Sequence, residues 1–410
     1  MAQADRRRTI GSLSLAYVLL ACGLSVTAAL PELRRTVGMS DTVTSLHGSF
    51  FGWGLLFGGL FGSRALVRFG RMNVLVVGVV AVGVGGVLFG TAHVVAQSLA
   101  GGAAIGLGGA AVVSAIPGLV ADRFGSERNA IFTKLNVAPG IGGFTFPLLL
   151  AIAPVIGVSW RWPTSMLPGL LVVVFIVSVG PLLGAVASQV PSDRPGTRMR
   201  DVVGLLRLPG VRQRFVLQIL HVAIEFSLGT WMVVFLREEG GFSKAAAPIG
   251  GAAWAIGMMA SRSLVPRLTV WLGGRLEALC LLGGIVSALS ILLVPVAPVR
   301  LLCVILASFS FGPLYVLGVE RLFVNAEAAG VDDTTAVSSL AAVSSGLAIT
   351  IGPFVVGVIA DQIGLRAALL FGPVAAAVAL VLCLVRWGGE AGRIGLADSA
   401  VVQGPKPLRA

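Results

Sequence analysis

A glutamate stands near the middle of a long apolar stretch, residues 217–238, which reads LQILHVAIEFSLGTWMVVFLRE. In a helix that rises about 1.5 Å per residue, Glu225 lies about eleven residues, or roughly 16 Å, from Arg214 on one side and Arg237 on the other. His221 lies one turn earlier, so the two side chains share a helix face. Carboxylates this deep in a membrane commonly carry protons or contact a transported solute. Glu225 is therefore the first candidate for proton coupling and solute binding, and His221 is a second solute-binding candidate.

Both residues also have a structural interpretation. Glu225 would then be a protonated or hydrogen-bonded brace between two helices, and His221 a packed core residue. Removal from water favours the neutral form of a carboxyl group, and the sequence offers no Arg or Lys in the middle of a span to keep Glu225 ionised. We therefore expect Glu225 to take up and release a proton near neutral pH.

Aromatic and amide side chains in other apolar stretches are further candidates for solute contacts. Trp254 and Trp53 have faces that could stack on sugars or bind cations, with plain packing as the alternative. Tyr17 and Tyr315, the only tyrosines, could offer hydroxyl groups or anchor helices at the membrane interface. Asn136 could hydrogen-bond a solute or hold two helices together.

Charged residues in two short loops are candidates for a gate. The segment SRALVRFGR contains Arg68 and Arg71, and the segment VADRFGSER contains Asp122 and Arg128. An ion pair among these residues could close one end of a pathway, and a solvated loop is an equal alternative.

Other chemistries lack the residues they need. The three histidines lie in different apolar stretches and the four cysteines show no metal-binding spacing, so we expect neither a metal site nor an enzyme. No phosphate-binding Gly-x-x-x-x-Gly-Lys-Ser/Thr loop occurs, so we expect no cofactor, and any transport must use a gradient. The net charge of +12 is scattered over short loops, which argues against a nucleic-acid partner.

The elements that position these residues are predicted to be membrane-spanning helices. The chain has 410 residues, of which 56% are hydrophobic and 12% charged, and its mean hydropathy is +0.95. A membrane-spanning helix needs about 20 apolar residues, and the sequence contains many apolar runs of about this length. These runs do not alternate in polarity as barrel strands do, so we predict that they are helices. We predict twelve spans, at 10–31, 43–64, 72–91, 94–121, 129–152, 162–188, 213–236, 245–266, 275–297, 300–322, 338–360 and 364–386.

Basic residues predict the orientation of these spans. With the N-terminus inside, about 23 of the 30 Lys and Arg residues fall in cytoplasmic segments. We therefore expect a multi-pass protein of the cytoplasmic membrane with both termini in the cytoplasm. The predicted domains are an N-terminal six-helix bundle at 1–188, a cytoplasmic linker at 189–212, a C-terminal six-helix bundle at 213–387 and a cytoplasmic tail at 388–410.

The two halves also resemble one another in sequence. SRALVRFGR has a counterpart in SRSLVPRL about 198 residues later, and FPLLLAIAPVIGVSWRW has one in GPFVVGVIADQIGLRAA about 206 residues later. With this layout, RFGR after the second span and GLVADRFGSERNA after the fourth, the chain resembles the major facilitator superfamily. The resemblance implies an all-α polytopic fold of two pseudo-symmetric six-helix bundles that rock about a central site. Spans seven and eight faintly resemble fucose-permease-like members.

Two positions depart from the pattern of that family. Val67 stands where the loop after the second span usually carries an Asp, so we expect a weak latch at that gate. Gly102 stands where many proton antiporters of the family carry an Arg.

The resemblance implies a secondary active transporter. The expectation is a monomer that moves a small organic solute by alternating access, with proton symport of a sugar-like or other polar metabolite. Proton-driven efflux of a drug-like compound is the alternative, and a membrane sensor without transport is a remote one. Its partners would be the solute, protons and the lipid bilayer.

Overall fold

The computed structural model describes residues 3–124, 127, 131, 134–135, 137–186, 199–331 and 333–385. These residues form helices and no strand. Nine helices among them are long and apolar enough to cross a membrane. The all-helical membrane fold predicted from the sequence is therefore confirmed, while the count of twelve spans and their division into two bundles stay predictions.

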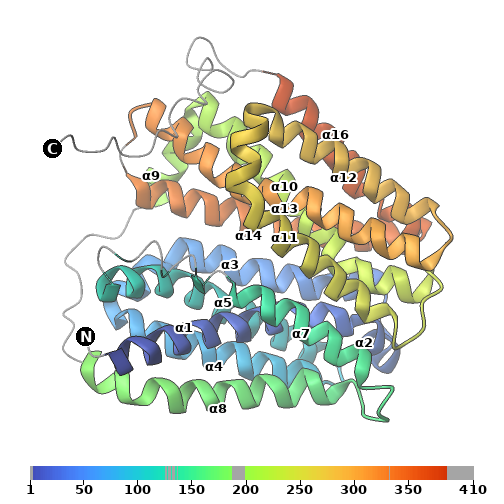
Figure 1. Ribbon diagram of the computed structural model, residues 1–410, viewed down its shortest axis with the longest axis horizontal. Helices are drawn as coiled ribbons and strands as arrows, with labels where there is room; N and C mark the ends of the chain where they lie inside the picture. The colour runs from blue at the N-terminus through green and yellow to red at the C-terminus, as the bar shows by residue number, and fades with distance from the viewer. Residues whose placement is uncertain are drawn as a thin grey trace.

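The first half of the chain, residues 3–186, contributes seven α-helices and one short 3-10 helix to the described structure. Their bounds are α1 Gln3–Leu24, η1 Ser25–Ala29, α2 Leu30–Val37, α3 Asp41–Phe69, α4 Arg71–Gly90, α5 Val95–Phe124, α7 Ala138–Ile152 and α8 Arg161–Val186. In Figure 1 these helices lie together in the lower part of the molecule. We call them the N-terminal half.

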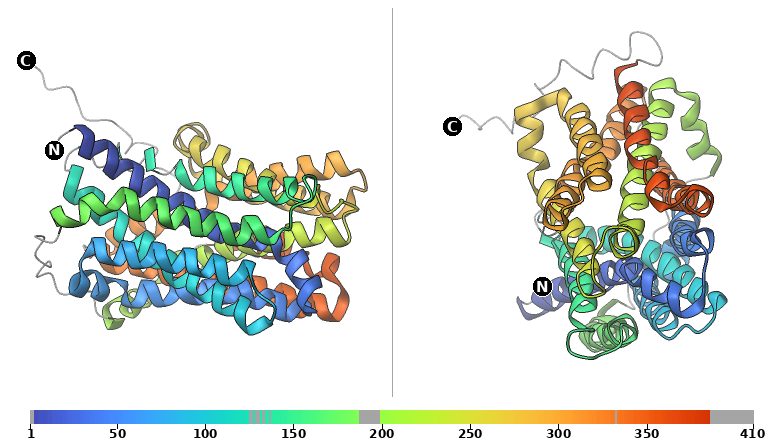
Figure 2. Two further views of the ribbon diagram at one scale, coloured as in Figure 1. Left: turned by 90° about the horizontal axis from the view of Figure 1, so that it is seen from below. Right: turned by 90° about the vertical axis from the view of Figure 1, so that its right-hand side faces the viewer.

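The second half, residues 199–385, forms the upper part of Figure 1, and we call it the C-terminal half. Its elements are α9 Met199–Gly204, η3 Leu205–Arg207, α10 Pro209–Glu238, α11 Ala247–Leu272, η4 Gly273–Arg275, α12 Leu276–Leu293, α13 Ala297–Ala328, α14 Thr334–Ile363, α15 Leu365–Ala368 and α16 Phe371–Leu384. Figure 2 views the two halves from below and end-on. The predicted tail at 388–410 lies outside the described residues.

The end of the predicted linker packs on the C-terminal half. Val202 and Leu205 are buried against residues near the ends of α13 and α14, among them Leu322 and Leu340. Residues 189–198 of the predicted linker lie outside the described residues. The remaining part joins the C-terminal half because two of its apolar side chains are covered there.

Glycines let the helices of the N-terminal half approach closely. A Cβ atom on Gly54 of α3 would lie 2.2 Å from the backbone of Gly106 in α5, and one on Gly58 would lie 2.1 Å from the Cβ of Ala110. Small residues at such positions let backbones touch, which is how membrane helices gain packing without a hydrophobic driving force. This contact fixes the position of α3 against α5. Another face of α3 lies against the C-terminal half.

The halves meet chiefly where α3 packs on α14 and α7 packs on α11, and α10 makes smaller contacts with η1 and α2. A Cβ on Gly52 of α3 would lie 2.4 Å from the backbone nitrogen of Thr350 in α14. The Ser49 hydroxyl donates a hydrogen bond of 2.7 Å to the carbonyl oxygen of the same threonine. The chain therefore places α3 between two close contacts, one within its own half and one across the interface.

Candidate functional site

A cavity of about 170 Å³ lies between the two halves. Residues of α1, η1, α3, α4, α5 and α7 line it from the N-terminal half, and residues of α10, α11 and α14 line it from the C-terminal half. Glycine and apolar side chains make up most of the lining. The side chains with polar groups among the lining residues are Ser25, Thr27, His47, Glu225, Thr230 and Trp254.

Glu225 lines this cavity and is held by an arginine. Its residue is 8% exposed, and Arg262 Nη2 donates to both Oε1 and Oε2 at 2.8 Å. Arg262 Nε also donates to the carbonyl oxygen of Gly312, at 3.2 Å. The guanidinium carbon lies 5.5 Å from the centroid of the Tyr315 ring. A carboxylate, a guanidinium and a phenol thus meet at the edge of the cavity.

The expectation that no basic residue reaches Glu225 was therefore wrong. The predicted span ended at residue 266 and placed Arg262 near the membrane interface, but α11 continues to Leu272. The longer helix sets Arg262 deeper, and its side chain reaches α10. The apolar residues that follow Arg267 in the sequence could have indicated that the helix continues beyond residue 266.

The predicted tryptophans and tyrosines separate into different environments. Trp254 lines the cavity and is 9% exposed. Trp53 is 53% exposed and stands in an aromatic row on α3 with Phe50 and Phe57, away from the cavity lining. Tyr17 is buried in the apolar core of the N-terminal half. Tyr315 reaches the site through Arg262, and Asn136 lies outside the described residues.

His47 lines the cavity and was not among the predicted site residues. Its Nδ1 lies 3.0 Å from the carbonyl oxygen of Thr44, and its Nε2 lies 2.8 Å from Ser98 Oγ. The ring also meets Phe89 edge-on, with 5.7 Å between ring centroids. A histidine inside the predicted span 43–64 was the signal available in the sequence.

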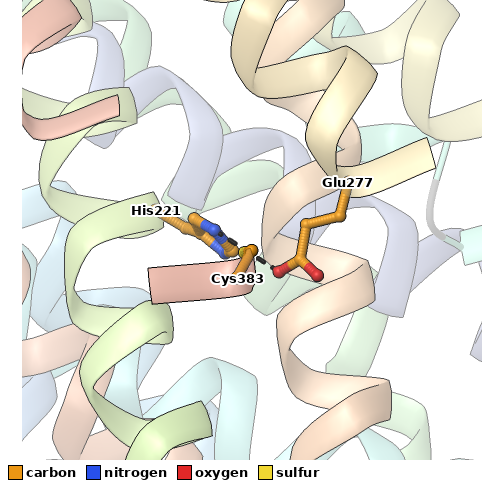
Figure 3. A group of neighbouring side chains, drawn as sticks. All are labelled: His221, Glu277 and Cys383. Carbon is orange, nitrogen blue, oxygen red and sulfur yellow. Dashed lines mark ion pairs between the residues drawn. The ribbon is translucent and has the colours of Figure 1, made fainter. Parts of the chain in front are cut away.

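His221 faces a second polar group instead of the cavity. Its Nε2 lies 3.6 Å from Glu277 Oε1, and Cys383 Sγ completes a set of three atoms that lie within 4.8 Å of one another. Figure 3 shows these side chains converging from α10, α12 and α16. Arg214 Nη1 contacts Glu277 Oε2 at 3.2 Å, and Arg321 binds the same oxygen.

The three side chains in Figure 3 are of types that can hold a metal ion. The two guanidinium groups on Glu277 argue against one, because they already neutralise the carboxylate and repel a further positive charge. The charges of this group therefore suit a buried ion-pair network better than a metal centre.

The predicted gate residues are partly placed by the structure. Arg71 at the start of α4 pairs with Asp122 near the end of α5. The Arg68 guanidinium lies 5.3 Å from the centroid of the Phe69 ring. Arg128 lies outside the described residues. The Arg71–Asp122 pair joins two helices of one half, so it braces that half and forms no latch between the halves here.

A cluster of charges joins the halves at the other end of the molecule, which we call the Asp41 end. Asp361 of α14 accepts from the backbone nitrogens of Asp41 and Thr42 at 2.7 and 2.8 Å, and so caps α3 from the opposite half. Arg34 binds Asp41 and contacts Glu238 Oε2 at 3.2 Å. A carboxylate at a helix N-terminus is favoured by the helix dipole.

The acid groups of this cluster repel one another. The pKa of Asp41 is raised above its ordinary value, chiefly by burial and further by the carboxylates of Asp361 and Glu238, while the Arg34 guanidinium acts in the opposite direction. Protonation of Asp41 would remove this repulsion. The contact between the halves at the Asp41 end is therefore expected to be firmer in acid.

A helical membrane protein with a cavity between two halves has the architecture of a transporter. The sequence profile of the Major Facilitator Superfamily matches residues 13–331. The chain belongs to this family.

Solved structures of a bacterial homolog of the human lysosomal transporter Spinster are similar in fold. The inward-facing, occupied form aligns with a TM-score of 0.70 and 15% identity, over 94% of this chain and 97% of that one. The inward-facing, unoccupied form aligns with a TM-score of 0.68 and 16% identity, over 95% and 100%. No curated protein matches the chain. At this identity the likeness defines the fold alone.

Proposed function

We propose that the protein is a proton-coupled secondary transporter of a small, largely apolar organic solute. The observation that carries the proposal is the position of Glu225, which lines the cavity between the halves and is paired with Arg262. Membrane transporters of this kind bind solute at the interface of two repeats and work by alternating access.

The lining of the cavity supports an apolar solute over a sugar. Several of its polar groups are already bonded to the protein: Ser25 donates to Ala21, Thr27 donates to Leu24, and His47 meets Thr44 and Ser98. A sugar needs many hydrogen bonds, and unpaired polar groups in a dry site are costly. Of the two solutes considered from the sequence, the drug-like compound therefore has the better support, and export in exchange for protons is the direction we favour.

Proton coupling would act through the Glu225–Arg262 pair. The ionised carboxylate holds Arg262 between α10 and α11, and protonation of Glu225 removes that attraction. Arg262, whose side chain is 37% exposed, would then be free to turn toward water. Proton uptake thus changes the charge and the shape of one cavity wall, which is what a coupled transporter requires.

The conformation is part of the same proposal. The charge contacts between the halves at Arg34, Asp41 and Asp361 support closure of the Asp41 end. If the basic loops are cytoplasmic, the protein is inward-facing with both termini in the cytoplasm. A reporter fused after Ala410 should be active only inside the cell, and activity outside would overturn this orientation.

The test of function is transport into proteoliposomes with an imposed pH gradient. A panel of amphipathic aromatic compounds and a panel of sugars would be offered to the purified protein, and movement of a compound under the gradient identifies the solute class. Glu225→Gln, which resembles the protonated form, should still exchange solute across the membrane but lose accumulation against a gradient.

The matched control is Glu320→Gln on α13, because that residue is exposed and does not line the cavity. It should accumulate solute like the parent protein. Accumulation by Glu225→Gln at the parental level would show that Glu225 is not the proton carrier and is a brace between helices. Movement of sugars alone would reject the apolar solute.

A further inference from the structure

A row of polar side chains runs along one buried face of α10, the helix that carries Glu225. Arg214, Gln218, His221 and Glu225 follow at intervals of four, three and four residues, so they share one side of the helix. Gln218 and His221 are at most 1% exposed, and Glu225 is 8% exposed. The row therefore leads from the cavity toward the end of the molecule where α10 begins.

The facing helix, α13, follows the row at matching positions. Gly312 and Tyr315 meet Arg262 beside Glu225, and Arg321 binds Glu277 at the far end. Between them lies Gly318, where a Cβ atom would stand 1.8 Å from Gln218 Oε1. Only glycine leaves room here for the amide of Gln218.

The middle of the row holds buried polar atoms that have no hydrogen-bond partner among the residues that the structure describes. They are Nε2 and Oε1 of Gln218, Nδ1 and Nε2 of His221, and Oε1 of Glu277. Native proteins rarely bury such atoms unpaired, and ordered water is the usual partner where several of them converge. Five unpaired atoms on three neighbouring side chains therefore indicate internal water beside His221.

We propose that this row is a proton path, separate from the solute cavity, that connects Glu225 with the end of the molecule where α10 begins. The proposal rests on the proposed function of Glu225 as the proton carrier. Water would bridge Glu225 to His221, and further water would bridge His221 to the solvent beside Arg214 and Arg321.

The transfer is a chain of proton exchanges. A proton from solvent binds one ring nitrogen of His221, and the proton on the other nitrogen leaves to the water beside Glu225. That water protonates the carboxylate, one O–H bond forms on Glu225, and the ion pair with Arg262 ends. Histidine suits this step because each of its two nitrogens can hold a proton.

The charges around His221 decide whether the step is feasible. The groups that face it or its immediate partners from the surrounding helices are Arg214 and Glu225 of α10, Arg262 of α11, Glu277 of α12, Tyr315 and Arg321 of α13, and Cys383 of α16. Two guanidinium groups bind Glu277 Oε2, and Oε1 of the same carboxylate faces the His221 ring. The guanidinium groups of Arg214 and Arg321 oppose a second proton on the ring, so one ring nitrogen releases its proton as the other nitrogen binds one, and the ring stays neutral before and after the step.

The experiment follows the protonation of Glu225 itself and needs no solute. Purified protein in lipid nanodiscs is subjected to a pH jump while infrared spectroscopy records the C=O band of the protonated carboxyl group. Glu225→Gln identifies which band belongs to Glu225. The parent protein gives the rate at which this band appears.

His221→Gln should slow the appearance of the band on the order of 100-fold, the usual contribution of a positioned proton donor, and should leave its final size unchanged. Gln218→Leu is the second variant, because it removes the two unpaired amide atoms with little change in volume and should fold if His221→Gln does not. Gln218→Leu should also slow the appearance of the band. His93→Gln changes an exposed histidine and should have the parental rate.

The outcomes separate this path from the function it rests on. A parental rate in both His221→Gln and Gln218→Leu would overturn the path and leave Glu225 as the carrier. If no band of the parent protein is lost in Glu225→Gln, both the carrier and the path are overturned. If equimolar Zn²⁺ slows the band in the parent protein but not in His221→Gln, protons reach Glu225 past His221, and that outcome supports the path.

Discussion

The ion pair between Glu225 and Arg262 can be tested by measuring stability without any knowledge of the solute. Arg262→Gln leaves a carboxylate that is 8% exposed beside the cavity without its only salt-bridge partner in the described part of the chain. Glu225→Gln instead leaves a guanidinium whose side chain is 37% exposed and still contacts Gly312 and Tyr315. The two substitutions therefore should not cost the same.

The magnitudes follow from the burial of each group. Loss of one partner from a fully buried ion pair costs about 3–5 kcal/mol, and a hydrogen bond to a charged group contributes about 1.5–3 kcal/mol. Because Arg262 is partly exposed, we take the lower part of this range and expect Arg262→Gln to lower the free energy of unfolding by about 2 kcal/mol. For Glu225→Gln we expect about 1 kcal/mol, since water and Gly312 still satisfy the arginine.

The assay is a double-mutant cycle by reversible SDS unfolding in mixed micelles at neutral pH. The double variant should lose less than the sum of the single variants, with a coupling energy of about 1 kcal/mol or more. Arg267→Gln, on the same helix and exposed, is the control and should change stability by less than about 0.5 kcal/mol. A coupling energy within the error of zero, or a larger cost for Glu225→Gln than for Arg262→Gln, would refute the reasoning.

Gly54→Ala should lower the free energy of unfolding in the same SDS assay by about 1–3 kcal/mol, because its Cβ would meet the α5 backbone at 2.2 Å. Gly180 lies in open space, so the control Gly180→Ala should be neutral or stabilising. Asp361→Ala should weaken closure of the Asp41 end by about 1–2 kcal/mol, seen as faster thiol labelling from that end; an unchanged rate would mean that this cap does not hold the halves together. Val67→Asp adds the missing carboxylate near Arg71, so it should favour closure at that end. If accessibility labelling shows no shift, the loop does not act as a gate.

The sequence alone determined that the protein lies in a lipid membrane and that its fold is helical. A chain that is 56% hydrophobic and 12% charged cannot hide its apolar residues in a soluble core. The length of the apolar runs then predicts helices, because every backbone group in lipid must be paired within the chain. The loop motifs carried the resemblance to the family that the profile match confirms.

The sequence also selected Glu225, because a carboxylate in the middle of an apolar run is conspicuous without any structure. The sequence contains no comparable indication that Arg262 and His47 belong to the site. Arg262 stands near the end of its apolar run, and only the length of α11 shows how deep its side chain reaches. His47 needs the partner Ser98 from another helix, about fifty residues away in the chain.

Tertiary structure alone decided which polar residues share a site. Helical periodicity gives the face on which a side chain stands but not the helix that covers this face. For that reason Trp53, predicted in the cavity, lies in an exposed aromatic row, and His221 faces Glu277 of α12 rather than the cavity. Neighbours from distant segments depend on how closely helices pack. That packing is set by small residues such as Gly52 and Gly318, whose partners Thr350 and Gln218 lie 298 and 100 residues away in the chain.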